Sequence, residues 1–527
     1  MNIVSFSPFG YEGALVVVEV DLRRGIPAVD IVGLADNAVK EARERMRSAI
    51  RNSALNFPLE RVLINLSPAD LKKEGSGFDL AIALAVLQAN ENTNHSQEKV
   101  LVMGELELSG NLRTVRGLHA AILTAIEHDI KYCIIPQGFD FDANLLGSIE
   151  IFQVETLLEA KQALEHISNK QTMPSQSTPK QTHTKKHTNP EITFPPVKPH
   201  QEFSAVKNQT KLVRALQIAA AGNHNLLAFG PPGCGKTLAL QKFPSLLPTL
   251  SLDESRETTR IWSLAGLITT STQLLTEPPF RMPHQSASLE GLVGGGLHCH
   301  PGEISLAHNG VLFLDEAAEF RTSVLQTLRV PLESSSVTLS RAGRHTVFPA
   351  NFQLLIATNP CPCGNFGSQD KLCLCSSLAV ENYWKKFSGP LLDRVDIRVS
   401  LLSSHSLSKD TLLNTDFAKS AQITSGISTK ELRKPIKIAR EIQLLRQGKL
   451  NSKLLPEEIT FFCTLDKESE EILNRYSEKY DFSTRAIHSC IKMARTIADM
   501  ETSYDIKPNH ILEAIYYRKS QGVMDMC

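Results

Sequence analysis

One short stretch, NLLAFGPPGCGKT at residues 225–237, constrains the fold of this chain more than any other feature. An apolar run suited to a buried strand leads into a glycine-rich turn, a lysine and a hydroxyl, which is the spacing of a phosphate-binding loop. In such a loop backbone N–H groups point at phosphate oxygens, the lysine neutralises the terminal phosphates and the hydroxyl holds Mg²⁺. A glycine-rich turn without a ligand is the alternative.

A second apolar run, GVLFLDE at 310–316, ends in two carboxylates. Open α/β sheets bind ligands at the carboxyl ends of their strands, so these carboxylates are placed for nucleotide chemistry. We expect Asp315 and Thr237 to hold Mg²⁺ and Glu316 to polarise the attacking water, although a helix N-cap at a strand exit is an alternative. The residues predicted to bind ATP are Gly230, Pro231, Pro232, Gly233, Cys234, Gly235, Lys236, Thr237 and Asp315.

Length and composition set the context for this site. A chain of 527 residues exceeds one hydrophobic core, so about two to four domains are expected. The formal net charge is +0, and any nucleic-acid surface must therefore be a local patch. The beginning of the chain does not resemble a secretory leader, and no apolar run reaches about 18 residues. We expect a soluble cytoplasmic protein with no membrane partner.

The predicted domains follow the changes in composition along the chain. Residues 1–167 alternate strand-like and helical patterns, which indicates a mixed α/β domain, and the polar stretch 168–200 is predicted to be a disordered linker. Residues 201–405 carry the phosphate loop in a core with a parallel sheet, and 406–430 form a polar connector. Residues 431–527 have helical periodicity and are predicted to be an all-helical lid over the nucleotide. Strands are expected at 14–20, 61–66 and 131–136, and helices at 35–53, 79–87, 467–476, 485–500 and 507–517.

Two segments of the N-terminal part, DLKKEGSGFD at 70–79 and GELELSG at 104–110, resemble the proteolytic domain of Lon-type proteases, which use a Ser/Lys dyad. On that alignment the nucleophile position falls on Gly77 and the lysine position on His119. Ser76 lies one position away, but a serine without a base is a poor nucleophile. This domain is therefore expected to be a catalytically dead scaffold.

Two further features of the core are candidates for contacting and moving DNA. The first is an insert at 278–301, which is rich in Gly, Pro and His. Compact domains rarely carry so long a loop unless it has a function, so we expect a functional loop. A passive surface insertion is the alternative. A hairpin is predicted from two alternating strands at 337–348 with a cationic tip. The candidate DNA contacts are Arg281, His284, Arg341 and Arg344. The apolar run QLLIATN at 353–359 is predicted to place Asn359 beside the terminal phosphate.

The order of these motifs, followed by GPLLDRVD at 389–396, resembles the AAA+ ATPases. PGEISLAHNG at 301–310 and NPCPCG at 359–364 are similar to the magnesium-chelatase-like branch, which carries a helix-2-type insert. With the Lon-like N-terminal domain, the chain resembles the ComM/YifB family of bacterial natural transformation. This resemblance implies a ring in which Arg394 is an arginine finger and Arg485 a second sensor, which with Glu316 and Asn359 makes the catalytic set. Surface ion pairs are the alternative for both arginines.

Four cysteines follow a C-x-C-x₉-C-x-C pattern, which favours a structural zinc site. Four thiols in a reducing compartment suit tetrahedral Zn²⁺, which would fold an otherwise irregular loop. The C-x-C spacing is tighter than usual, so free thiols in a turn stay an alternative. The candidate metal ligands are Cys361, Cys363, Cys373 and Cys375.

The function that the resemblance implies is a hexameric, ATP-driven DNA motor, a helicase or branch-migration enzyme. Its partners would be single-stranded and branched DNA, and recombination proteins are a further candidate. A chelatase-like or chaperone-like remodeller of a protein partner is the alternative. A protease is disfavoured by Gly77 and His119.

Overall fold

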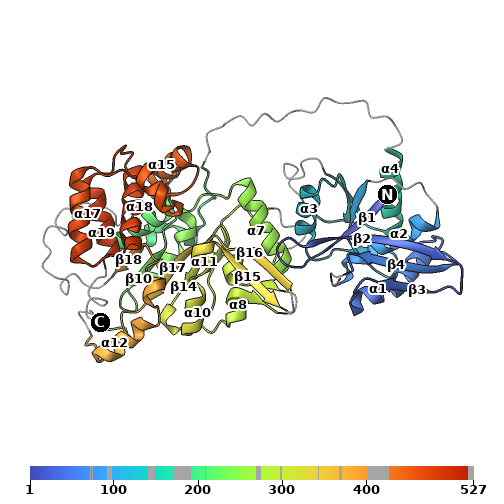
Figure 1. Cartoon of the computed structure of the whole chain (residues 1–527), viewed down its shortest axis with the longest axis horizontal. Coiled ribbons are helices and arrows are strands. Elements are labelled where there is room, and N and C mark those ends of the chain that lie inside the picture. Colours follow the sequence, from blue (N-terminus) through green and yellow to red (C-terminus); the bar gives the residue numbers. More distant parts are fainter. Residues whose placement is uncertain are drawn as a thin grey trace.

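A computed structural model shows the N-terminal part and the helical C-terminal part on either side of a central α/β core (Figure 1). Residues 171–191 of the predicted linker and residues 402–425, which include most of the predicted connector, lie outside the described residues. The structure describes residues 1–69, 71, 73, 75–91, 98–140, 149–170, 192–207, 209–268, 274–296, 299–341, 344–366, 371–401 and 426–519.

The N-terminal part is built on a seven-stranded mixed sheet of order β3-β4-β2-β1-β5-β8-β9. The predicted strands and helices of this part are confirmed. In β4 every second residue is buried, because its sequence RVLINLS alternates between the core and the surface. Its elements are β1 (Asn2–Ser7), β2 (Ala14–Arg23), β3 (Val29–Val32), α1 (Asn37–Asn52), β4 (Arg61–Ser67), α2 (Asp79–Asn90), β5 (Lys99–Val102), β6 (Glu105–Leu106), β7 (Leu112–Arg113), α3 (Leu118–Glu127), β8 (Tyr132–Pro136), β9 (Glu150–Val154) and α4 (Leu157–Lys170).

The central part contains a five-stranded parallel sheet of order β11-β14-β17-β10-β18. Strands β10, β14 and β17 are buried along their whole length, as their continuous apolar runs predicted. Because all five strands are parallel, the residues that follow β10, β14 and β17 meet at one edge. The strands are β10 (Leu226–Phe229), β11 (Phe280–Arg281), β14 (Val311–Leu314), β17 (Gln353–Thr358) and β18 (Ile397–Ser400).

Helices and two small antiparallel hairpins surround this sheet. The predicted hairpin is confirmed: β15 (Ser336–Arg341) pairs with β16 (Arg344–Pro349) between β14 and β17. The insert contains a second, short hairpin. The other elements are α5 (Thr210–Gly222), α6 (Lys236–Gln241), α7 (Leu252–Ala265), α8 (Leu289–Val293), β12 (Gly294–Gly295), β13 (His300–Pro301), α9 (Glu303–Leu306), α10 (Thr322–Thr327), α11 (Pro331–Ser334), α12 (Ser377–Lys385) and α13 (Gly389–Leu392).

The C-terminal part is helical, as predicted, and it shares one hydrophobic cluster with the sheet and α5. Gln217 on α5 donates to the carbonyl of Leu432 at 3.0 Å, and Arg518 on the last helix donates to the carbonyl of Val395 just before β18. These contacts dock the helices on α5 and on the amino end of β18. The helices are α15 (Thr429–Gln447), α16 (Pro456–Phe462), α17 (Lys467–Lys479), α18 (Thr484–Met500) and α19 (Pro508–Arg518).

Among the described residues, the N-terminal part meets the core at two places. The turn between β1 and β2 reaches the β15–β16 hairpin, where the backbone N–H of Tyr11 donates to Oγ1 of Thr346 at 3.2 Å. Helix α3 lies against α7, and Arg260 on α7 pairs with Glu127 on α3 at 2.7 Å. The Arg260 guanidinium also lies 5.4 Å from the ring centroid of Tyr11. In the described part of the chain no helix is long and apolar enough to cross a membrane.

Candidate nucleotide site

The phosphate loop joins β10 to α6. Gly233 and Gly235 have φ angles of 82° and 84°, in the left-handed region that favours glycine. The Lys236 ammonium donates to the carbonyls of Gly230 at 2.6 Å and Pro231 at 2.9 Å, so it is held over the loop. Burial lowers the pKa of Lys236. A desolvated ammonium at this place interacts strongly with phosphate oxygens.

The carboxylates and Asn359 meet Lys236 and Thr237 at the carboxyl edge of the sheet. Thr237 Oγ1 donates to Asp315 Oδ1 at 3.0 Å, which joins the two predicted Mg²⁺ ligands. Asn359 Oδ1 accepts from Lys236 Nζ at 3.4 Å. Glu316 is exposed and has a φ of 47°, an uncommon conformation for a residue other than glycine. The structure brings these predicted residues together, and they can hold a triphosphate with Mg²⁺ and a water for in-line attack.

Arg394 and Arg485 lie close to each other, away from the phosphate loop, and both pair with Glu333. Nη2 of Arg394 lies 2.5 Å from Oε2 of Glu333, and Nη2 of Arg485 lies 3.6 Å from the other carboxylate oxygen. The hydrogen bond from Arg394 is the main reason that the pKa of Glu333 is lowered. Glu333 cannot be predicted from the sequence, since a single glutamate on the short helix α11 carries no local signal.

The arginine pair lies at the amino edge of the sheet, opposite the phosphate loop. Both arginines line a cavity of about 610 Å³ together with Asn225, Phe352 and Asp396. These three residues precede β10, β17 and β18, whereas the phosphate loop follows β10. Since the strands are parallel, the sheet separates the arginines from Lys236 of the same chain. The helical part therefore does not bring Arg485 to the phosphate loop of its own chain.

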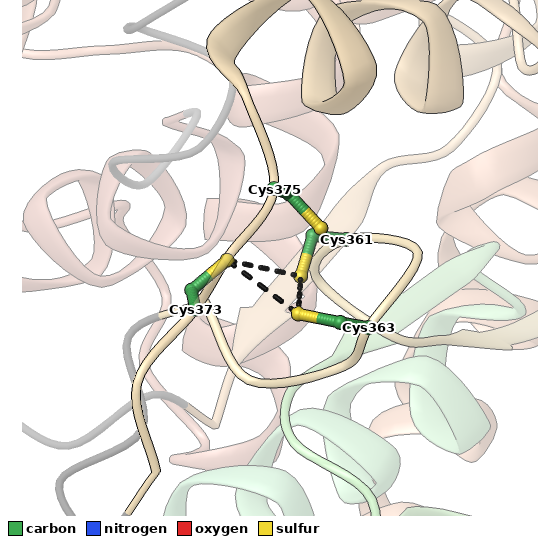
Figure 2. Close-up of side chains that lie close together, drawn as sticks. All are labelled: Cys361, Cys363, Cys373 and Cys375. Carbon is green, nitrogen blue, oxygen red and sulfur yellow. Dashed lines mark hydrogen bonds between the residues drawn. The ribbon is translucent and has the colours of Figure 1, made fainter.

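The cysteine cluster, which we define as Cys361, Cys363, Cys373 and Cys375, follows β17 (Figure 2). The four sulfur atoms lie within 4.8 Å of one another, so this set can hold a metal ion. A hydrogen bond from the backbone of Asn365 is the main reason that the pKa of Cys363 is lowered to about 6, and burial raises the pKa of Cys373 to about 12. Residues 361–364 form a turn in which the backbone N–H of Gly364 donates to the carbonyl of Cys361 at 2.9 Å, and the sulfur atoms of Cys361 and Cys363 lie 3.4 Å apart despite the tight C-x-C spacing.

The candidate DNA contacts are spread over two segments. Arg281 is bound to Glu303 by two hydrogen bonds of 2.6 and 2.7 Å, so its charge is compensated within the chain. His284 is exposed and shares a hydrogen bond with Ser286. Arg341 and Arg344 face each other in the register at the end of the β15–β16 hairpin, and their side chains lie outside the described residues.

The Lon-like positions of the N-terminal part have structural partners. Ser76 Oγ donates to the carboxylate of Glu105, and Lys73 Nζ donates to the carbonyl of Pro68. His119 is buried, with its ring centroid 4.6 Å from that of Phe139. Ser76 and Lys73 therefore each hydrogen-bond to other groups, and the catalytically dead scaffold stays a prediction.

Three family models match the chain. "Magnesium chelatase, subunit ChlI" matches residues 202–409, "Subunit ChlI of Mg-chelatase" matches 18–138, and "Magnesium chelatase, subunit ChlI C-terminal" matches 426–518.

Relatives extend the match over nearly the whole chain. Competence protein ComM of Haemophilus influenzae is 38% identical over 98% of this chain and 97% of its own length. Uncharacterized protein YifB of Escherichia coli is 38% identical over 97% of this chain and 95% of its own length. A probable DNA helicase of Arabidopsis thaliana, MCM9, is 26% identical over 48% of this chain and 33% of its own length. With the phosphate loop, the parallel sheet and the helical C-terminal part, these matches show that the chain belongs to the ComM/YifB family of magnesium-chelatase-like AAA+ ATPases.

Proposed function

We propose that this protein hydrolyses ATP in a ring, and that Arg394 and Arg485 of one chain complete the site of the next. The observation that carries this proposal is their position at the edge of the sheet opposite Lys236. Phosphoryl transfer needs positive charge around the terminal phosphate from several directions. Arg394 and Arg485 lie at the edge of the sheet opposite their own phosphate loop. The nucleotide site that they complete most simply is therefore that of a neighbouring chain.

The proposed work of this ring is the movement of single-stranded or branched DNA, as a hexamer acting in natural transformation with recombination proteins. The β15–β16 hairpin supports this proposal, because it lies in the segment that joins β14, which Asp315 follows, to β17, which Asn359 follows. A shift of those residues during hydrolysis would move the hairpin and its two arginines. The printed names of two relatives, a competence protein and a probable DNA helicase, point to the same kind of substrate.

A protein-remodelling function is the second candidate. All three matching family models are named after a magnesium chelatase subunit, and Arg281 in the insert is already paired with Glu303. On this alternative the hairpin would contact a protein partner instead of DNA.

The two candidates are separated by ATP turnover with and without single-stranded DNA, together with migration of a labelled four-way junction at low salt. The motor predicts at least a few-fold stimulation by DNA and loss of junction migration in Lys236→Ala. Substitution of Arg341 and Arg344 by alanine should weaken DNA binding and reduce its salt dependence. Absence of DNA binding at low salt would exclude the motor and favour the remodeller.

A further inference from the structure

We propose that the cysteine cluster binds one Zn²⁺, and that this ion fixes the loop carrying Asn359 against the phosphate loop. The first part of this proposal, the binding of Zn²⁺, is independent of catalysis. The second part rests on the proposed ATPase function.

Three of the four sulfur atoms are spaced like three corners of a tetrahedral thiolate site, and the fourth, of Cys375, lies within 4.8 Å of them. Three Sγ–Sγ distances are 3.4, 3.6 and 3.6 Å, among Cys361, Cys363 and Cys373. Zinc–sulfur bonds of about 2.3 Å require edges of about 3.8 Å in a tetrahedron. A disulfide would need a sulfur separation of about 2 Å, so these sulfurs are arranged around a point instead of bonded in pairs. Four thiolates in this geometry favour zinc among the biological divalent ions.

The surroundings of the sulfurs suit a closed structural site. Cys361 is fully buried, and the backbone N–H of Phe366 points at its Sγ at 3.4 Å. Backbone N–H groups that bond to thiolates orient them and compensate their charge. Residues 371–376 form neither helix nor strand, so an ion bound by Cys373 and Cys375 would fix a segment that no helix or strand holds.

The same loop touches the nucleotide site. Cys361 follows Asn359 by two residues, and the carbonyl of Pro360 between them accepts from Trp384 Nε1 at 3.0 Å. Gly364, directly after Cys363, packs closely against the phosphate loop. If this residue had a side chain, its Cβ would lie 2.9 Å from Cδ of Pro232. The same Cβ would lie 3.9 Å from Cγ of Asn359. An ion that holds this turn therefore sets the position of two nucleotide-binding segments.

The metal half is tested by elemental analysis of the full-length protein and by exchange for Co²⁺. We expect about one zinc per chain, and the visible bands of tetrahedral Co²⁺–thiolate after exchange. The double variant Cys363→Ser, Cys373→Ser should lose the metal, whereas Cys463→Ala, outside the cluster, should keep it. A wild-type chain that binds no metal, binds iron in place of zinc, or keeps its zinc in the double variant would overturn the site.

The coupling of the metal to catalysis is tested on wild-type protein from which zinc is removed with a metal chelator and then restored. We expect ATP turnover to fall at least tenfold on removal and to recover with zinc. In a Trp262→Phe background Trp384 is the remaining tryptophan, and its emission should shift with metal content. Unchanged turnover and emission in folded, zinc-free protein would overturn the coupling.

A Lys236→Ala control separates this proposal from the proposed function. It should lose turnover and keep its zinc, because the lysine contacts no sulfur of the cluster in the described structure. If wild-type protein binds zinc, shifts its Trp384 emission on metal removal and yet hydrolyses no ATP, the ATPase proposal fails and the metal site stands.

Discussion

Glu333 forms ion pairs with two arginines, Arg394 and Arg485. One carboxylate oxygen lies 2.5 Å from Nη2 of Arg394 and the other lies 3.6 Å from Nη2 of Arg485. A single carboxylate between two guanidinium groups keeps both on the same face of the cavity, although they come from different elements. On the proposed function, the γ-phosphate bound to a neighbouring chain would compete with Glu333 for these two guanidinium groups.

Arg394→Ala is expected to lower the maximal ATP turnover on the order of a thousandfold, as for other arginine fingers, with ATP affinity changed far less. Single-turnover hydrolysis and binding of a fluorescent ATP analogue measure the two quantities separately. Arg475→Ala, at an exposed position of α17, is the matched control and should behave like wild type. Turnover of Arg394→Ala close to that of wild type would remove this residue from the mechanism.

Asp396 gives a pH-dependent prediction. Burial by itself would raise its pKa, but His224, whose Nδ1 lies 3.4 Å from the carboxylate, and a hydrogen bond from Ser489 outweigh this effect and lower the pKa from 3.8 to about 2. Because the folded pKa is the lower one, the ionised carboxylate contributes about 2 kcal/mol to the free energy of unfolding above pH 4. That contribution is lost as the pH falls from about 4 towards about 2.

Asp396→Asn should therefore reduce the free energy of unfolding by about 2 kcal/mol at neutral pH, and the difference should narrow below about pH 4. Denaturant titrations of both proteins over this range measure it. A difference that stays constant down to about pH 3 would contradict the assignment.

At the scale of elements, the contact between the N-terminal part and the β15–β16 hairpin gives the scaffold a mechanical connection to the core. Tyr11 lies between Thr346 on β16 and the guanidinium of Arg260 on α7. Burial is the main reason that the pKa of Tyr11 is raised to about 12, so its hydroxyl stays protonated. A shift of the hairpin would be transmitted directly to the turn between β1 and β2.

Arg260→Ala is expected to loosen this contact by about 2 kcal/mol, since it removes a charge-assisted hydrogen bond and the cation–π contact. Hydrogen exchange of residues 8–13 and 118–127 should become faster, while exchange in β10 and β17 stays slow. Arg256→Ala on the same helix, whose partner Asp253 lies at the surface, is the control. Equal exchange in the two variants would show that Arg260 does not hold the parts together.

The sequence predicted elements and sites whose information is local. The phosphate loop, the strands ending at Asp315 and Asn359, the β15–β16 hairpin and the cysteine pattern are each contained in a few neighbouring residues. The position of Glu333 between two arginines and the contact of Tyr11 with Arg260 depend on tertiary packing. No spacing within one segment encodes them, so a single sequence could not predict them.

At the scale of the whole molecule, the sheet has one set of proposed catalytic groups at each edge. Lys236, Asp315 and Asn359 lie at the carboxyl edge, and Arg394 and Arg485 lie at the amino edge. On the proposed function, a single chain holds two complementary halves of a site, at opposite edges of the sheet. A closed ring brings such halves together at every interface.

The most direct test of this shared site is ATP turnover in mixtures of Lys236→Ala and Arg394→Ala chains. Each variant alone should be nearly inactive, but in a mixed ring an intact phosphate loop can meet an intact Arg394 from its neighbour. With random exchange at equal amounts, about a quarter of the interfaces are complete, so turnover should rise to about that fraction of wild type. If mixed rings form and turnover stays at the sum of the two inactive variants, the site is not shared between neighbouring chains.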